Sequence, residues 1–160
     1  MNTDKKISRR EALKRMGFAV MSSAIASSGL LSLASCETKR SKRIIFYFTG
    51  TGNSLYIARQ LAGENAELLS IPQMVKRGKY EFEADEIGIV YPIYGHMPPY
   101  MVRQFIQKAK LKAEYKFAVL TYGARKCDAV EIWDRISRKA DNAFDYINTI
   151  IMVDNWLPNF

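Results

Sequence analysis

The sequence predicts an α/β domain over residues 43–160, with a doubly wound parallel sheet of five strands between helices. Three observations predict it. Five short apolar runs, rich in β-branched and aromatic residues, follow one another along the chain. Segments with apolar residues at helical spacing separate these runs. A loop of glycines and hydroxyl side chains joins the first run to the first helical segment, at the sheet edge where doubly wound folds bind ligands.

Each predicted strand is a continuous apolar run, as expected for a strand that is buried on both faces of a parallel sheet. Pro72 and Pro92 stop the second and third runs, because proline lacks the N–H that a central strand needs. The five predicted strands cover residues 44–48, 67–71, 87–91, 117–121 and 146–153.

The segments between the runs have the spacing of amphipathic helices, and we interpret their Met, Trp and Phe residues as helix core. Pro98 and Pro99 suit the start of a helix. Residues 73–85 are polar and hold at most a short helix. The longer predicted helices cover residues 54–61, the stretch from Pro98 to Ala109, and residues 129–136.

The sequence ends at Phe160, shortly after the fifth run, and leaves no room for a helix that would close the fold. We therefore expect one face of the sheet to be partly bare, or to be covered by another polypeptide or segment.

Residues 1–35 are predicted to be an export signal. Ser8-Arg9-Arg10 followed by Leu13-Lys14 resembles the twin-arginine signal, although Ala12 stands where that signal often has Phe. An uncharged run then ends in Leu33-Ala34-Ser35-Cys36, which resembles a lipobox whose Cys is lipidated.

A plain transmembrane anchor and an ordinary cleaved signal are the alternatives for this segment. The order of the three features favours a lipoprotein that is exported by the twin-arginine route and anchored in the bacterial cell envelope, on the periplasmic side. This route carries folded proteins, often with their cofactor inserted. Residues 36–42 form a polar tether after the signal.

Charge and cysteine content exclude some classes of function. The formal net charge is +8, but half of it lies in the first fifteen residues, and the rest forms no basic stripe. A nucleic-acid partner is therefore not expected. Cys36 and Cys127 are too few to ligate an iron–sulfur cluster or a structural zinc, and no metal site is predicted.

The loop Thr49-Gly50-Thr51-Gly52-Asn53-Ser54 carries the predicted chemistry. It lies between the first strand and the first helix, and a helix N-terminus offers unpaired N–H groups and partial positive charge to a phosphate. Glycines let the backbone curl around an anion, and the hydroxyls of Thr49, Thr51 and Ser54 and the amide of Asn53 add donors. The loop suits a phosphate monoester that is held by neutral groups.

Other phosphate sites fit less well. A Walker loop needs a lysine, and the dinucleotide fingerprint needs a third glycine where Leu55 stands. A tyrosine-phosphatase loop needs Cys and Arg in this turn. A receiver domain needs an aspartate where Tyr91-Pro92 stands.

The stretch Ile44 to Ser54 resembles the first strand and phosphate loop of flavodoxins, most closely the flavodoxin half of bacterial flavodoxin–ferredoxin fusion proteins. Residues 89–98, 118–123 and 152–158 resemble that family's third strand and flavin-ring loop, its fourth strand and second ring loop, and the stretch after its fifth strand. The resemblance covers residues 43–160 and implies a flavodoxin-like fold with strand order 2-1-3-4-5 and FMN as the cofactor. The ferredoxin half, with its cysteine clusters, is not in this sequence.

The resemblance also implies the roles of the site residues. The FMN phosphate would be held by Thr49, Gly50, Thr51, Gly52, Asn53 and Ser54. The flavin ring would lie between two loops, one with Tyr94, Gly95, His96 and Met97 and the other with Tyr122 and Gly123. No catalytic residue is predicted, because the flavin itself carries the electrons.

Several of these residues keep two interpretations each. Tyr122 and Gly123 close one side of the pocket or form a simple tight turn. Tyr94 stacks on the ring or is a surface aromatic. His96 contacts the flavin or faces solvent. Trp156 shields the ring or plugs an uncovered sheet face. Cys127, at a helix start, is either a favoured thiolate position or inert.

The leading hypothesis is an FMN-binding electron-transfer protein of the cell envelope. It would act as a carrier between redox partner proteins or as an enzyme that reduces a small acceptor such as a quinone. The alternatives are a lipid-anchored, non-catalytic partner domain with a flavodoxin-like fold, or a fragment of a longer flavodoxin–ferredoxin protein.

Overall fold

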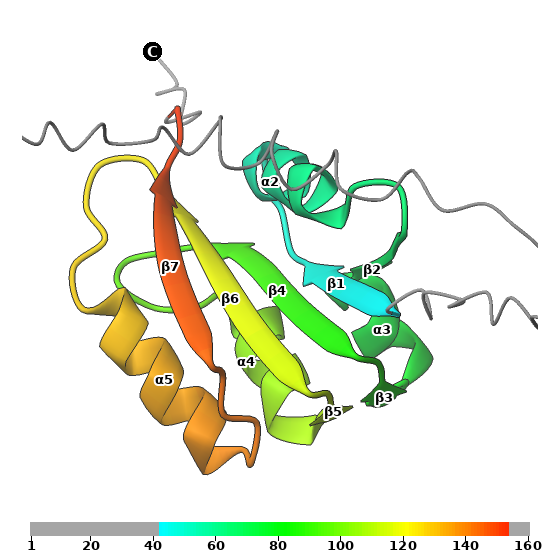
Figure 1. Ribbon diagram of the computed structural model, residues 1–160. Coiled ribbons are helices and arrows are strands. Elements are labelled where there is room, and N and C mark those ends of the chain that lie inside the picture. Colours follow the sequence, from blue (N-terminus) through cyan, green and yellow to red (C-terminus); the bar gives the residue numbers. More distant parts are fainter. Residues whose placement is uncertain (1–41, 154–160) are drawn as a thin grey trace, which may run out of the picture. The chain divides into compact units, whose positions relative to one another are not determined.

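The computed structural model describes residues 42–153 (Figure 1). Its strands are β1 (Arg43–Tyr47), β2 (Ala66–Ser70), β3 (Glu81–Glu83), β4 (Glu86–Pro92), β5 (Lys110–Lys112), β6 (Tyr115–Tyr122) and β7 (Tyr146–Ile151). Its helices are α2 (Asn53–Ala62), α3 (Ile71–Arg77), α4 (Tyr100–Lys108) and α5 (Ala129–Lys139). The predicted export signal, the lipidation site Cys36, the tether up to residue 41 and the predicted role of Trp156 lie outside the described residues.

The large sheet is parallel and has the predicted topology. Its five strands follow the order β2-β1-β4-β6-β7, which is the order 2-1-3-4-5 when they are counted along the chain. β4 lies in the middle, and its residues Ile87 to Tyr91 are all buried. The continuous apolar run of this strand is explained by its position, because helices cover both of its faces. The flavodoxin-like fold class is thus confirmed.

The boundary after β2 differs from the prediction. We expected strand residues up to Ile71 and at most a short helix within residues 73–85; the short helix α3 is present, but it begins directly at Ile71. Pro72 lies in the first helical turn, where its missing N–H is not needed. Gly78 ends α3 with φ of 64°, and its N–H bonds to the carbonyl oxygens of Met74 and Val75.

A second, two-stranded parallel sheet was not predicted. It pairs β3 with β5, and each strand has only three residues. Phe82 and Leu111 are buried in it, between charged neighbours. Lys110 Nζ lies 2.8 Å from Glu81 Oε1 across the pair. Three residues are too few for a period of two to be recognised in the sequence.

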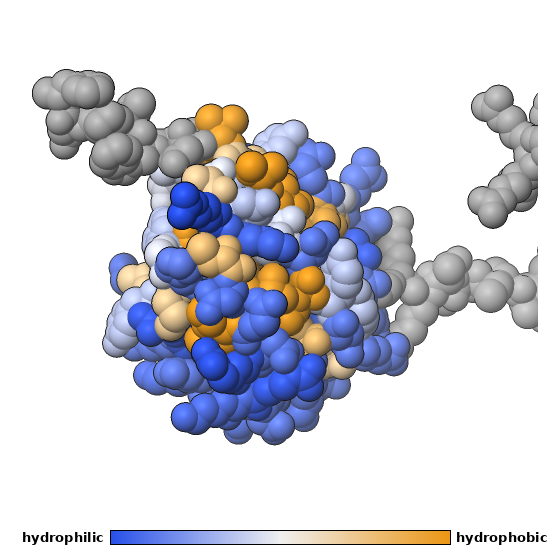
Figure 2. Space-filling model, turned by 90° about the vertical axis from the view of Figure 1, so that its left-hand side faces the viewer, coloured by the Kyte–Doolittle hydropathy of each residue, from blue (hydrophilic) through white to orange (hydrophobic). Residues whose placement is uncertain are grey.

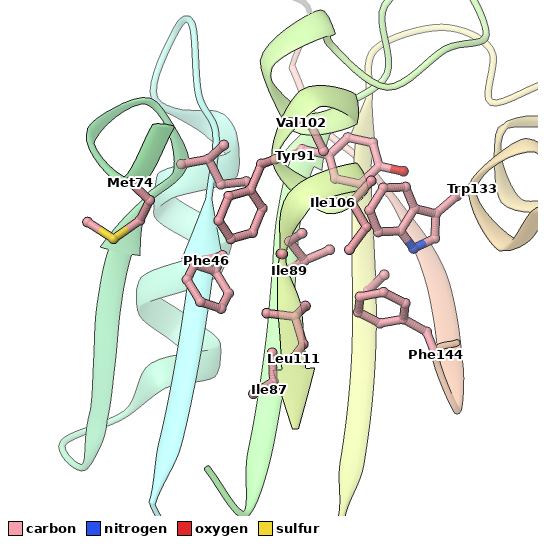
Figure 3. Packing of buried hydrophobic residues seen from close by; sticks show 14 of the residues in the cluster. Phe46, Met74, Ile87, Ile89, Tyr91, Val102, Ile106, Leu111, Trp133 and Phe144 are labelled. Atoms are coloured by element: carbon pink, nitrogen blue, oxygen red, sulfur yellow. The ribbon is translucent and has the colours of Figure 1, made fainter. Parts of the chain in front are cut away.

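The helices divide unequally between the faces of the large sheet. The larger hydrophobic cluster joins the sheet to α3, α4 and α5, and includes Met74, Val102 and Trp133 (Figure 3). The smaller cluster lies on the other face, where α2 contributes Ile57 and Ala58.

Within residues 42–153, α2 is the helix of the smaller cluster, and it leaves part of its face of the sheet open (Figure 1). Phe117, Ile150 and Met152 pack against this cluster but are only partly buried. The exposed Tyr115 ring stacks on Phe117, with 6.1 Å between the centroids. Figure 2 shows the side of the molecule where β7 and α5 lie, with hydrophobic residues in patches among hydrophilic ones. Among residues 42–153, this face of the sheet is therefore less covered than the opposite face.

Candidate functional site

The candidate site lies at the carboxyl ends of the parallel strands, where doubly wound sheets bind ligands. Loops that follow β1, β4, β6 and β7 surround a cavity of about 560 Å³ there. This volume is within the range of about 300–1,000 Å³ that is typical of small-molecule pockets. The cavity is lined by Thr49, Gly50, Thr51, Asn53, Ser54, Pro92, Ile93, Tyr94, Thr121, Tyr122, Gly123, Ala124, Arg125, Met152 and Val153.

The loop between β1 and α2 forms one wall. Gly52 has φ of +99°, a backbone conformation that residues with a side chain rarely adopt. Its N–H donates to Thr49 Oγ1 at 2.9 Å. No side chain caps α2, and the first helical hydrogen bond runs from the N–H of Tyr56 to the carbonyl of Gly52. The N–H groups of Ser54 and Leu55, which precede Tyr56 in α2, therefore have no helical carbonyl to bind, as at any helix N-terminus.

Tyr94 crosses from the β4 loop to this first loop. A Cβ atom on Gly50 would lie 2.7 Å from the Tyr94 hydroxyl, so only glycine allows the tyrosine to approach so closely. The Tyr94 ring also meets Phe48 edge to face, at 6.4 Å between centroids, and is 52% exposed. Tyr94 thus stands beside the cavity with one part of its ring open to solvent.

Two polar side chains of the first loop bind other strands. Ser54 Oγ lies 2.8 Å from Thr121 Oγ1, and both residues are almost fully buried. One of these two hydroxyls donates to the other, so one hydrogen remains for a further acceptor. Asn53 Nδ2 donates to the carbonyl of Val153 at 2.8 Å. These bonds fix the start of α2 against the ends of β6 and β7.

Residues Tyr94 to Met97 form a tight turn that closes on itself. The N–H of Tyr94 donates to the carbonyl of Met97 at 3.0 Å, and the reverse bond measures 3.1 Å. Gly95 and His96 have φ of 53° and 72°, and positive φ at both central positions is typical of a type I′ turn. These bonds use the N–H and the carbonyl of both Tyr94 and Met97 within the turn itself.

The predicted site residues therefore divide into two groups. Most of them line the cavity, as given above. Gly52, Gly95, His96 and Met97 do not line it: Gly52 shapes its wall, and the other three belong to the turn. His96 is largely exposed, and its Nδ1 lies 3.6 Å from Asp128 Oδ1 on the next loop.

The sequence did not identify several lining residues, among them Thr121, Arg125, Met152 and Val153. Thr121 and Met152 lay within predicted strands and were therefore interpreted as part of the sheet. Arg125 is in a loop without a periodic pattern. The signal that finds them is topological, since the end of every parallel strand on this edge contributes to the cavity.

Cys127 does not line the cavity. It is exposed, has φ of 46°, and precedes α5 rather than starting it. In the part of the chain that the structure describes, no group of three or more His, Cys, Asp or Glu side chains is arranged to hold a metal ion. The described helices include none that is long and apolar enough to cross a membrane.

The arrangement suits an anionic ester attached to a flat ring. The lining combines N–H and hydroxyl donors at a helix N-terminus with the apolar and aromatic side chains of Ile93, Tyr94 and Tyr122. None of the described lining residues is a carboxylate, which would repel an anion.

Comparisons with known proteins agree on the fold. No model of a protein family matches the sequence, and no curated protein sequence matches it. A solved protein from Bacteroides eggerthii, described as a flavoprotein, is 17% identical with a TM-score of 0.52, covering 70% of this chain and 88% of its own. A flavoprotein from Lactobacillus acidophilus, solved in complex with FMN, is 12% identical with a TM-score of 0.50, covering 68% and 93%. A two-electron-reduced flavodoxin from Megasphaera elsdenii is 19% identical with a TM-score of 0.48, covering 68% and 84%.

Proposed function

We propose that this chain binds FMN in the cavity and acts as an electron-transfer flavoprotein. The observation that carries the proposal is the wall between β1 and α2. There, Gly52 in a left-handed conformation, an uncapped helix N-terminus and the Thr49 and Thr51 hydroxyls border a cavity of about 560 Å³. These groups match the requirements of a phosphate monoester that is bound without a lysine.

The lining residues include groups suited to the phosphate of FMN and groups suited to its ring. The N–H groups at the start of α2, with Thr49 and Thr51, would hold the phosphate. Tyr94 from one loop and Tyr122 and Gly123 from the other would hold the ring between them, since all three line the cavity. When bound, FMN would supply the electron transfer, and the chain would bind it, orient it and limit its contact with water.

The comparisons support this proposal by analogy. The Lactobacillus acidophilus protein that shares the fold was solved with FMN, and the Bacteroides eggerthii protein is described as a flavoprotein. At 12% and 17% identity these likenesses concern the fold, so the cofactor of this chain is argued from its own loop.

We further propose that the domain works in the bacterial cell envelope. Arg9-Arg10, the uncharged run after them and the motif that ends in Cys36 support export by the twin-arginine route and a lipid anchor at Cys36. Its partners would then be redox proteins or small electron acceptors such as quinones at the membrane.

A visible spectrum of the purified full chain tests the cofactor. We expect a yellow protein with flavin absorption, and a protein that is colourless and takes up no added FMN would refute the proposal. Labelling cells with a radioactive fatty acid tests the anchor. Cys36→Ser should abolish the label, and Cys127→Ser serves as the matched control that should keep it. Label that persists in Cys36→Ser would contradict the lipid anchor.

A further inference from the structure

One charged residue stands out in the cavity. Arg125 follows β6. Among the described residues that line the cavity, it alone carries a full charge at neutral pH. The sequence analysis expected neutral donors only, so this positive charge is an unexplained feature of the site.

The charge of Arg125 has no counter-ion within residues 42–153. Arg125 is exposed and takes part in no ion pair or side-chain hydrogen bond there. The nearest carboxylate along the same loop, Asp128, faces His96 with 3.6 Å between Oδ1 and Nδ1. Arg125 therefore brings to the lining of the cavity a positive charge that no ion pair within residues 42–153 compensates.

The loop that carries Arg125 borders the turn of residues 94–97 rather than standing alone. Just before the two segments, the N–H of Ile93 donates to the carbonyl of Thr121 in β6 at 2.8 Å. Near the end of the Arg125 loop, Asp128 meets His96. Arg125 lies between Thr121 and Asp128 along the chain, and it lines the same cavity as Tyr94 of the loop that is proposed to hold the flavin ring.

We propose that Arg125 raises the reduction potential of the flavin by stabilising negative charge on the reduced ring. The inference rests on the proposed FMN function. Reduction adds two electrons and one proton to the neutral oxidised ring and leaves it with one negative charge. A nearby cation attracts that charge and has no such attraction to the neutral ring, so the reduced form is bound more tightly.

A role in holding the phosphate gives a different result. The phosphate keeps its charge when the ring is reduced, so a cation that binds only the phosphate stabilises both forms equally. Removing it weakens binding and leaves the potential unchanged.

Three variants test the inference: Arg125→Gln, Arg125→Lys and Lys126→Gln. The first removes the charge, the second keeps it, and the third removes a neighbouring charge that does not line the cavity. Each purified protein is titrated with FMN and then reduced with dithionite at mildly alkaline pH beside a dye of known potential.

For Arg125→Gln we expect the affinity for reduced FMN to fall about fivefold relative to that for oxidised FMN. This is a fall of roughly 20 mV for a two-electron couple, in which tenfold corresponds to 29.6 mV. Arg125→Lys and Lys126→Gln should keep the wild-type potential. The difference should also shrink in about 1 M salt, where the Debye length is about 3 Å.

The outcomes separate the two proposals. If the wild-type chain takes up no FMN, the proposed function fails. If it binds FMN but Arg125→Gln has the wild-type potential, or if Arg125→Lys shifts as much as Arg125→Gln, the inference about Arg125 is overturned while the flavin function stands.

Discussion

Replacing Gly52 by alanine tests whether the left-handed turn of the first loop creates the phosphate site. Gly52 has φ of +99°, and a Cβ built on it meets no atom within 4 Å, so the cost of alanine is conformational rather than steric. Such strain is of the order of 1–3 kcal/mol. Gly78 is a matched control, because it has φ of +64°, equally open space around its Cβ, and a position at the end of α3.

We expect both Gly52→Ala and Gly78→Ala to lower the free energy of unfolding by about 1–2 kcal/mol, measured by urea denaturation without FMN. Only Gly52→Ala should also weaken FMN binding. In this variant the loop would relieve its strain by rotating the N–H of residue 52, which in the wild-type chain donates to Thr49 Oγ1. We expect at least a tenfold rise in Kd, or about 1.4 kcal/mol, in a titration of FMN fluorescence. Equal affinity in the two variants would refute the role of the turn, even if the wild-type chain binds FMN.

Three further predictions concern the scaffold, and urea denaturation checks each. A Cβ on Gly88 would lie 2.4 Å from Phe117 Cζ, so Gly88→Ala should cost about 1–3 kcal/mol, and adding Phe117→Leu should recover part of it; no recovery would contradict the clash. Asn142 is buried, accepts from the N–H of Leu111 and donates to three backbone carbonyls, so Asn142→Ala should cost about 2–4 kcal/mol; a loss under 1 kcal/mol would show that these bonds contribute little. Tyr91 has a buried hydroxyl without a partner in the described chain, so Tyr91→Phe should gain about 1 kcal/mol. Burial raises the pKa of Tyr91 well above its usual value, so this gain should grow above about pH 10, where only the unfolded wild-type chain ionises at this residue; a constant gain would contradict that cause.

The sequence was sufficient for the large sheet because its strands are long, apolar and separated by helical segments. β4 and α5 show this most clearly. A strand that is buried on both faces has a continuous apolar run, whereas a helix that is buried on one face has apolar residues at helical spacing. The sequence did not predict β3 and β5, because each has only three residues. It also misplaced the start of α3, because this helix follows β2 at Ile71 without a loop between them.

The sequence predicted the part of the site whose residues are neighbours along the chain. Thr49 to Ser54 belong to one turn, and their glycines and hydroxyls are visible in sequence. Arg125, Thr121 and Val153 reach the cavity because the sheet brings distant strand ends together. Such proximity depends on strand order and helix placement, and no local pattern encodes it.

The bond from Asn53 to Val153 joins residues that lie 100 positions apart, and the pair Ser54 and Thr121 spans 67. The loop after β1, the first described strand, is thus held in shape by Thr121 of β6 and by Val153, which follows β7. It follows that the loop reaches its final geometry late, after synthesis has passed β7. In a cell, uptake of a cofactor by this loop would therefore report that the described part of the chain has folded through β7.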